Sequence, residues 1–287
     1  MVLEGGGMRG LYTAGVLDTL LDEKIHIDGM VTVSAGALFG INFASRQKGR
    51  ALRYNKTYTN DKRYISIRSW LKTGDMVNKE FAYYTVPFSL DVFDEDAFKK
   101  SGIDFYATVT NMETGKAEYV QITEPFKQME ALRASGSMPF VSRPIEHKGN
   151  KYLDGGVSDS IPLEQAEALG YEKNIVILTR PLDYRKTKPS DFIIDRWYKN
   201  YPAFKAALKN RYKNYNDTIE KIIEDEKQGK TFVIRPSETI PIKRLERDPN
   251  KLQAMYDLGV KDATTRLKVL THYLEDKNEN VMKGTQQ

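Results

Sequence analysis

The chain has 287 residues, 40% of them hydrophobic, which is enough to bury a substantial core in one or two domains. It carries 44 Lys and Arg residues against 39 Asp and Glu residues, for a net charge of +5, and it contains no cysteine. The lack of cysteine excludes disulfides, thiolate metal sites and cysteine nucleophiles, and it is typical of a reducing compartment such as the cytoplasm.

The chain opens with a short apolar stretch, residues 1–3, which leads through a glycine-rich loop into a helix predicted over residues 11–23. The loop consists of Gly5, Gly6, Gly7, Met8, Arg9 and Gly10. Consecutive glycines leave the backbone N–H groups uncovered, and the N-terminal end of the helix adds positive potential. The loop is therefore suited to a negative charge, either a cofactor phosphate or an oxyanion formed during a reaction. Because it begins almost at Met1, we expect no signal peptide.

The second predicted strand, residues 30–33, is apolar and β-branched, and it leads directly into Ser34. A helix pattern follows from Ala35 to Tyr54. A serine at a sharp strand-to-helix turn, followed by small residues such as Ala35 and Gly36, is typical of a nucleophile elbow. Because the ends of neighbouring parallel strands share one crevice, we expect Ser34 to face the glycine loop.

The rest of the chain alternates between strand and helix patterns. Strands are predicted over residues 105–110, 117–122, 175–178 and 232–234, and helices over 125–134, 162–170 and 249–274, the last interrupted at Gly259. This alternation predicts an α/β protein, a three-layer α/β/α fold with a largely parallel central sheet and one antiparallel hairpin around residues 113–116. The longest apolar stretch, residues 31–44, is too short to span about 30 Å of hydrocarbon.

Asp154 is the candidate base for Ser34. It follows a short strand-like run and precedes Gly155 and Gly156, which allow the carboxylate to approach another backbone closely. The Gly-Gly-Gly-x-Arg-Gly loop, the serine elbow and the Asp-Gly-Gly segment occur in an order that resembles the patatin-like phospholipase family. The resemblance covers about residues 2–180 and includes the segment 133–139 upstream of the aspartate.

The resemblance implies a lipid acyl hydrolase with a Ser34–Asp154 catalytic dyad and an oxyanion hole in the glycine loop. It also implies a phospholipid or other acyl-ester substrate, no cofactor and no metal. The expected organisation is a single patatin-like domain over residues 1–287, with a core over about 1–180 and a helical, basic C-terminal part over about 184–277. Within this part, residues 184–230 are expected to form a lid or side lobe. One position departs from the family pattern, because Thr32 stands where the elbow usually has glycine, and we expect a slightly opened elbow there.

Other functions are compatible with parts of the sequence. Gly5, Gly7 and Gly10 match the spacing of a dinucleotide-binding fingerprint, but the second strand ends in Ser34 rather than in the acid that would bind a ribose. A non-catalytic lipid- or nucleic-acid-binding member of the fold is another alternative. The acidic run at residues 94–96 is interpreted as a helix N-terminus rather than a cation site.

A histidine could replace Asp154 as the base. The chain has three histidines, His26, His147 and His272. None lies in a glycine-flanked setting like that of Asp154, so a triad through His147 is the alternative to the dyad.

Two segments carry most of the positive charge. Residues 46–79 have a net charge of +8 and residues 185–230 a net charge of +5, and both are rich in Tyr and Trp. Such segments form ordinary solvated surface or a peripheral contact with an anionic membrane, where each basic residue contributes about 1 kcal/mol. They suit nucleic acid less well, and we expect no nucleic-acid partner.

Overall fold

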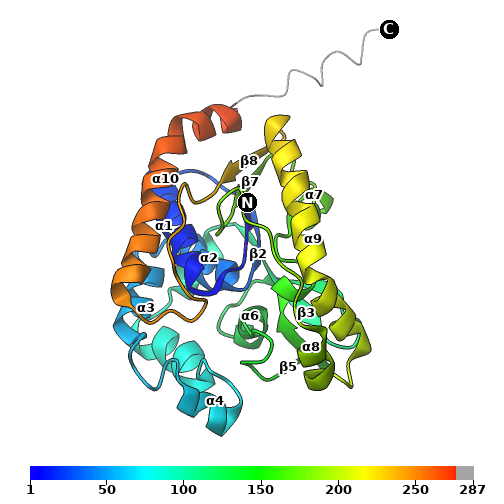
Figure 1. Ribbon diagram of the computed structural model, residues 1–287. Coiled ribbons are helices and arrows are strands. Elements are labelled where there is room, and N and C mark those ends of the chain that lie inside the picture. Colours follow the sequence, from blue (N-terminus) through cyan, green and yellow to red (C-terminus); the bar gives the residue numbers. More distant parts are fainter. Residues whose placement is uncertain (276–287) are drawn as a thin grey trace.

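The centre of the computed structural model, which describes residues 1–275, is a mixed β-sheet between two layers of helices (Figure 1). The strands are β1 Val2–Leu3, β2 Gly29–Val33, β3 Asp104–Asn111, β4 Ala117–Ile122, β5 Ile145–His147, β6 Asn150–Asp154, β7 Asn174–Ile177 and β8 Thr231–Ile234. Their order is β5-β6-β3-β2-β1-β7-β8, with β4 also paired to β3. Strands β3, β2, β1, β7 and β8 run parallel, whereas β4 and β6 run antiparallel to β3. The predicted α/β fold with a largely parallel sheet is confirmed.

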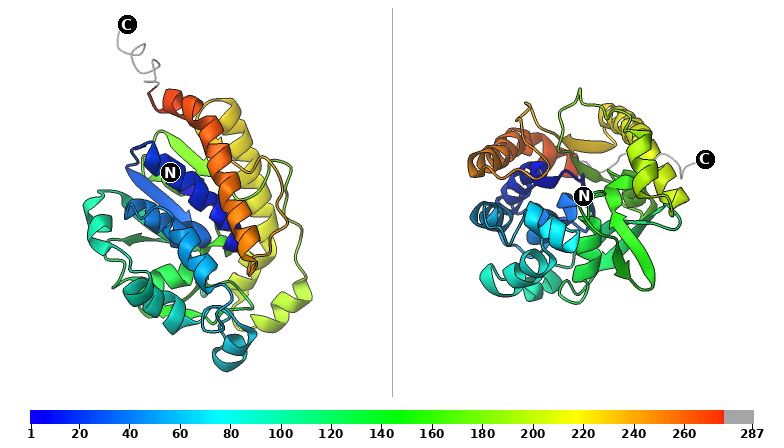
Figure 2. Two further views of the ribbon diagram at one scale, coloured as in Figure 1. Left: turned by 90° about the vertical axis from the view of Figure 1, so that its left-hand side faces the viewer. Right: turned by 60° about the horizontal axis from the view of Figure 1, so that its bottom comes forward.

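The helices form one layer on each face of the sheet. They are α1 Gly10–Asp22, α2 Ala35–Ala44, α3 Arg50–Tyr58, α4 Ile67–Thr73, α5 Glu95–Lys100, α6 Met129–Ser135, α7 Leu163–Ala168, α8 Asp191–Trp197, α9 Pro202–Lys227 and α10 Pro249–Glu275, with short helices at η1 Gly7–Arg9 and η3 Gly155–Val157 and a π-helix at η2 Glu80–Leu90. Helices α1, α2, α3 and α10 cover one face, and α7 and α9 cover the other (Figures 1 and 2).

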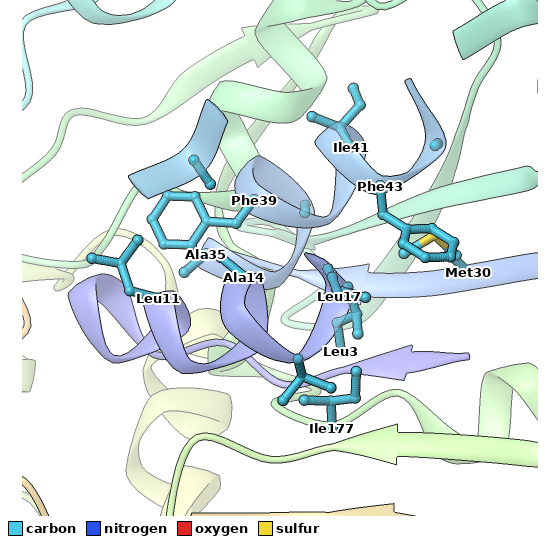
Figure 3. Close-up of a cluster of buried hydrophobic side chains, with 14 of the residues drawn as sticks. Leu3, Leu11, Ala14, Leu17, Met30, Ala35, Phe39, Ile41, Phe43 and Ile177 are labelled. Carbon is cyan, nitrogen blue, oxygen red and sulfur yellow. The ribbon is translucent and has the colours of Figure 1, made fainter. Parts of the chain in front are cut away.

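The alternation of side chains along the strands divides the core into two main clusters. Val2, Val31, Val176 and Val233 pack with α7 and α9 on one face. The neighbouring residues Leu3, Met30, Ile177 and Phe232 pack with α1, α2 and α10 on the other face. Figure 3 shows part of this second cluster, where apolar side chains of β1, β2 and β7 meet those of α1 and α2. Because both faces of the central strands are buried, most of their residues are apolar.

The C-terminal part completes both helical layers. The lid or side lobe expected over residues 184–230 was wrong, because α9 packs on the sheet. Helix α9 buries Tyr215, Ile219 and Ile222 in the cluster that covers the strand valines. Helix α10 buries Leu252 and Met255 in the cluster that contains α1. Residues 184–275 therefore share their hydrophobic cores with residues 1–180.

Helix α10 is continuous through Gly259, where the sequence predicted an interruption. A side chain at Gly259 would collide with the backbone oxygen of Tyr12 in α1, and one at Gly15 of α1 would collide with the backbone oxygen of Tyr256 in α10. These two glycines allow the two helices to pack closely. The close packing explains why glycine occurs inside a helix, although it lowers helix stability by about 1 kcal/mol relative to alanine.

Two other element boundaries differ from the prediction. The helix expected over residues 35–54 is divided into α2 and α3, because the backbone takes a left-handed conformation at Arg46 (φ +57°) and again at Gly49 (φ +71°), which precedes α3. The helix expected from Pro125 begins at Met129. Within residues 1–275, no helix has both the length and the apolar character needed to cross a membrane.

Candidate active site

Strands β2 and β6 share one edge of β3, because β4 occupies the other edge. On the shared edge, Val33 at the end of β2 pairs with Thr108, and Asp154 at the end of β6 pairs with the next residue, Val109. The two strands approach this point from opposite directions, so their last residues meet. Ser34 follows Val33 directly, and it therefore reaches Asp154 although 120 positions separate them in the chain.

The Ser34 hydroxyl donates a hydrogen bond to Asp154 Oδ2 over 2.7 Å. The other carboxylate oxygen, Oδ1, accepts from the Gly156 amide over 2.7 Å, which fixes the orientation of the carboxylate. Both side chains are buried, with Ser34 6% and Asp154 4% exposed. Ser34 has φ +56° and ψ −124°, a strained conformation for a residue with a side chain, at a cost of about 1–3 kcal/mol. The predicted contact between the two groups is present, and their catalytic roles stay a prediction.

The turn around Ser34 accommodates the threonine that stands in place of the usual glycine. The Thr32 side chain is fully buried, and its hydroxyl donates to the Tyr106 backbone oxygen of β3 over 2.7 Å. The Ser34 amide donates to Ser135 Oγ over 2.9 Å. Ala35 begins α2 directly after the serine, as the sequence predicts for an elbow. The threonine hydroxyl is thus satisfied within the sheet.

Burial raises the pKa of Asp154 above its ordinary value of 3.8. The positive charges of Arg211 and Arg244 act in the opposite direction, as do the hydrogen bonds from Ser34 and Gly156, but desolvation of the carboxylate is the largest effect. A carboxylate with a raised pKa is a stronger base than an ordinary aspartate, so this environment suits proton transfer from a hydroxyl.

Several amides of the glycine loop are already engaged in hydrogen bonds. The Met8 amide donates to the Arg244 backbone oxygen over 2.9 Å, and the Gly10 amide donates to carbonyls within the loop. The Gly5 amide lies 3.5 Å from the Ser160 carbonyl. Met8 and Gly10 therefore do not offer a free amide to an oxyanion, contrary to the expectation for the whole loop.

The amides of Gly6 and Gly7 donate no hydrogen bond to any group in residues 1–275. Both residues line a pocket that also contains Ser34 and Asp154. Gly7 has φ +58°, and a side chain there would collide with the Arg244 backbone. These two amides are the candidates for oxyanion donors.

An apolar pocket begins at Ser34 and extends between α2, α3, η2 and α6. It contains about 980 Å³ of empty space, part of it open to solvent, and its walls include Leu38, Phe39, Val86 and Leu132. The pocket is suited to a flexible hydrocarbon chain.

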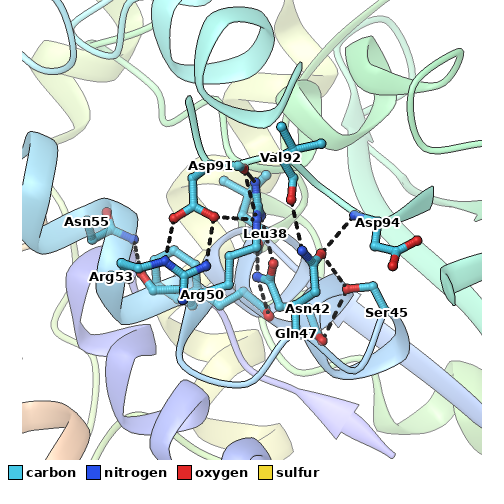
Figure 4. Close-up of polar contacts among 12 residues, drawn as sticks. Leu38, Asn42, Ser45, Gln47, Arg50, Arg53, Asn55, Asp91, Val92 and Asp94 are labelled. Carbon is cyan, nitrogen blue, oxygen red and sulfur yellow. Dashed lines mark hydrogen bonds and ion pairs between the residues drawn. The ribbon is translucent and has the colours of Figure 1, made fainter. Parts of the chain in front are cut away.

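A buried ion-pair network fixes the wall of the apolar pocket (Figure 4). Arg50 pairs with Asp91 and donates to Asn42 Oδ1 over 2.8 Å. Arg53 adds two hydrogen bonds of 2.8 Å to the Asp91 carboxylate. The network ties the segment after η2 to α2 and α3, and so holds this wall of the pocket in place.

A second, polar pocket lies on the β6 and α9 side of Ser34. Besides Arg9, four basic residues that the sequence analysis did not single out line it, namely Arg180, Lys186, Arg211 and Arg244. The charge count of residues 185–230 could not reveal which of them face inward. The helical spacing of α9 could have shown that Arg211 faces inward. Arg211 lies three residues after Leu208 and four before Tyr215, and both of these are buried on the sheet side of α9.

Four of the nine tyrosines and tryptophans in the two basic segments are buried. Tyr54 and Tyr64 line the apolar pocket, and Tyr198 and Tyr215 belong to core clusters. Trp197 is exposed. The tyrosines were misplaced because composition does not distinguish an interfacial aromatic side chain from one packed under a helix.

None of the three histidines lines either of the pockets that contain Ser34. His26 lies at the surface beside Asp28, His147 ends the short strand β5, and His272 lies in the last turn of α10. Asp94 caps α5 by accepting the Ala97 amide, as its interpretation as a helix N-terminus predicts.

Two family models match parts of this chain. The family model for patatin-like phospholipases matches residues 1–167, and a domain of unknown function, DUF6363, matches residues 201–275. The uncharacterized protein YjjU of Escherichia coli is 29% identical over 203 residues, which are 69% of this chain and 56% of that protein. Lysophospholipase nte1 of Aspergillus niger is 29% identical over 178 residues, which are 59% of this chain and 11% of that protein.

Among solved structures, VipD from Legionella pneumophila has a TM-score of 0.43 at 13% identity, covering 93% of this chain and 66% of that one. The chain thus spans about half of YjjU and a ninth of the fungal lysophospholipase. The family model, in contrast, matches more than half of this chain and includes the glycine loop, the serine elbow and the Asp-Gly-Gly segment. The protein therefore belongs to the patatin-like phospholipase family.

Proposed function

We propose that the protein is a lipid acyl hydrolase that cleaves carboxylic esters with Ser34 as nucleophile and Asp154 as base. The observation that carries the proposal is the 2.7 Å hydrogen bond from the Ser34 hydroxyl, which lines an apolar pocket, to a buried carboxylate. Membership of the patatin-like phospholipase family and the similarity to a protein named a lysophospholipase support the assignment to lipid esters.

The mechanism follows from the positions of the groups. As Ser34 Oγ attacks the ester carbonyl carbon, its proton passes to Asp154 Oδ2, and the developing oxyanion accepts from the Gly6 and Gly7 amides. Asp154 then gives the proton to the departing alcohol, which leaves an acyl group on Ser34. A water molecule, deprotonated by Asp154, then attacks the carbonyl carbon of this acyl-enzyme. The bond to Ser34 Oγ breaks, Asp154 returns the proton to Ser34 Oγ, and the fatty acid is released.

The two pockets on either side of Ser34 divide the substrate between them. The apolar pocket suits the acyl chain, because burying each methylene contributes about 0.8 kcal/mol. The polar pocket contains Asp154 and the glycine loop, and it is the place for the alcohol part of the ester. Arg9 is buried in its wall, where burial and the charges of Arg180 and Arg244 lower its pKa to about 10.

We also propose that one end of the molecule contacts an anionic membrane. Helix α4 exposes Ile67 (66%) and Leu71 (76%) beside the exposed basic residues Arg68 and Lys72. Helix α8, at the same end of the molecule, exposes Phe192 (78%) (Figure 1). Exposed apolar side chains next to basic ones suit the interface of an anionic bilayer. A cysteine-free chain suits a reducing, cytoplasmic compartment on one side of such a bilayer.

The segment between these two helices connects the proposed membrane face to the site. The Met76 amide after α4 donates to the Val141 carbonyl, and the ring of Phe140 packs against Trp197 of α8 at 5.6 Å between centroids. Met138, at the start of the same segment, lines both pockets that contain Ser34. A lipid entering between α4 and α8 would thus reach the nucleophile directly.

The proposal is tested by hydrolysis of a panel of acyl esters and phospholipids by the wild type, Ser34→Ala and Asp154→Asn. We expect cleavage by the wild type only, and labelling of the wild type but not of Ser34→Ala by a fluorophosphonate probe. A well-folded wild type that neither cleaves any ester nor reacts with the probe would indicate a non-catalytic lipid-binding member of the family instead.

A further inference from the structure

The polar pocket beside Ser34 is strongly cationic. Five basic side chains line it, Arg9, Arg180, Lys186, Arg211 and Arg244. The only acidic residues in its wall are Glu4 and Asp154. The wall therefore has a formal net charge of about +3 when both carboxylates are ionised. Four of the five cations lie beyond residues 1–167, the segment that the patatin-like family model matches.

None of the five cations has a carboxylate partner within 4 Å anywhere in residues 1–275. Lys186 donates to Ser160 Oγ over 3.0 Å and lies 3.6 Å from the centroid of the Tyr215 ring. Arg180 stacks on Tyr184 at 4.2 Å. These are contacts with neutral groups, which leave the charges uncompensated.

The two carboxylates in the wall are engaged elsewhere. Glu4 Oε2 accepts from the Thr179 amide over 2.6 Å and from its hydroxyl over 3.0 Å, and Asp154 accepts from Ser34 and Gly156.

The Arg9 side chain is buried, those of Arg180, Lys186 and Arg211 are half-buried, and Arg244 is exposed. Withdrawing unpaired cations from water is unfavourable. The Nε atoms of Arg9 and Arg211 are buried without a hydrogen-bond partner. Burial and the neighbouring charge of Arg211 hold the pKa of Lys186 well below its ordinary value. Buried charges are normally paired, and a cluster of unpaired ones beside a nucleophile is typical of a site for an anionic ligand.

The position of the pocket indicates which part of a substrate carries the negative charge. The acyl chain occupies the apolar pocket on the opposite side of Ser34, so the leaving alcohol lies among the cations. Arginine guanidinium groups that converge from different elements suit a phosphate, whose several oxygens accept from more than one donor at once. A zwitterionic head group would bring a cation into a wall that is already positive.

We propose that the cationic pocket binds a phosphate monoester on the leaving alcohol, so that the enzyme prefers acyl esters of phosphorylated alcohols over neutral and zwitterionic esters. This inference rests on the proposed function, and it names the substrate class of that site. Lys186 and Arg211 hold the phosphate, and the charge of the head group, rather than its size, determines the preference.

The test compares three esters with the same short acyl chain, which keeps them below micelle formation: a monoacylglycerol, its 3-phosphate and the corresponding phosphocholine ester. We expect kcat/KM for the phosphate monoester to exceed that for the other two by about tenfold or more, the effect of one charged hydrogen bond. Lys186→Met and Arg211→Met should each lower the ratio of phosphate to neutral ester about tenfold. The matched control is Lys213→Met. Lys213 is exposed on α9, the helix that carries Arg211, and this variant should keep the wild-type ratio.

Inorganic phosphate provides the second arm of the test. It should inhibit hydrolysis of the neutral monoacylglycerol competitively, with weaker inhibition of Lys186→Met than of the wild type. If the wild type hydrolyses the three esters equally well, the inference is wrong while the proposed function stands. If phosphate inhibits but the phosphate monoester is not preferred, the pocket binds free phosphate and not the leaving group, which also overturns the inference. If no ester is cleaved and no fluorophosphonate labelling occurs, it is the proposed function that fails.

Discussion

Replacement of Asp154 by asparagine separates the chemistry of the dyad from its structural role. The two side chains have the same shape, and the asparagine oxygen can keep the hydrogen bond from the Gly156 amide, now 2.7 Å long. The amide group then faces Ser34 Oγ, where Oδ2 now accepts over 2.7 Å. An amide does not accept the serine proton, so the variant loses general-base catalysis while the pocket walls stay in place.

The expected loss in kcat is about 10³-fold, which corresponds to about 4 kcal/mol of activation free energy. KM should change little, because asparagine has the same shape as aspartate and both pockets keep their form. For the wild type, kcat/KM should rise with pH through the pKa of Asp154, which burial places above 3.8, and this rise should be absent in Asp154→Asn. Steady-state assays with a soluble ester over pH 4–9 measure both effects.

Stability should change in the opposite direction to activity. Because burial raises the pKa of Asp154, the folded state binds its proton more tightly than the unfolded state does. The stability contributed by this group is therefore fully present below the unfolded pKa and is lost as the pH rises through the folded pKa. At neutral pH, Asp154→Asn should unfold at a higher temperature than the wild type, and this difference should shrink as the pH falls towards 4.

Two results would refute this reasoning. If Asp154→Asn kept more than a tenth of the activity while Ser34→Ala lost all of it, another group would be the base. If Asp154→Asn were inactive because it did not fold, the structural account of the carboxylate would be wrong. Thermal unfolding of both variants, followed by circular dichroism, distinguishes the two results.

Four further predictions follow from the structure. Replacing all three histidines should leave ester hydrolysis largely intact, and loss of activity in a folded variant would end the dyad hypothesis. Gly259→Ala should lower the unfolding free energy by about 1–3 kcal/mol, measured by urea titration, because the added methyl collides with α1. The double variant Ile67→Asp, Leu71→Asp should sediment less with anionic vesicles than the wild type, and high salt should weaken the binding of the wild type. The control Val269→Asp on α10 should bind like the wild type. If the double variant also bound like the wild type, α4 would not belong to the membrane face. Residues 1–180 alone should fail to unfold cooperatively, because we propose that residues 1–275 fold as one unit. A cooperative unfolding transition of residues 1–180 would indicate two independent folding units instead.

The sequence by itself determined the features that depend on neighbouring residues. The glycine loop, the turn at Ser34 and the Asp-Gly-Gly segment are local patterns, since backbone conformation and turn chemistry depend on a few adjacent side chains. The alternation of apolar strands and amphipathic helices predicted the α/β class for the same reason. These patterns were sufficient to name Ser34 and Asp154 as partners, by resemblance to a family.

Tertiary structure alone decided how these parts meet. Strands β2 and β6 end at adjacent positions on β3, a pairing between segments 120 residues apart that no local pattern encodes. It also decided that α9 lies on the sheet, which turns Arg211 of a basic surface-like segment into a wall of the site. Charge and composition describe what a segment contains, but burial depends on which other segment covers it, and this is why the cationic pocket became visible only in the folded chain.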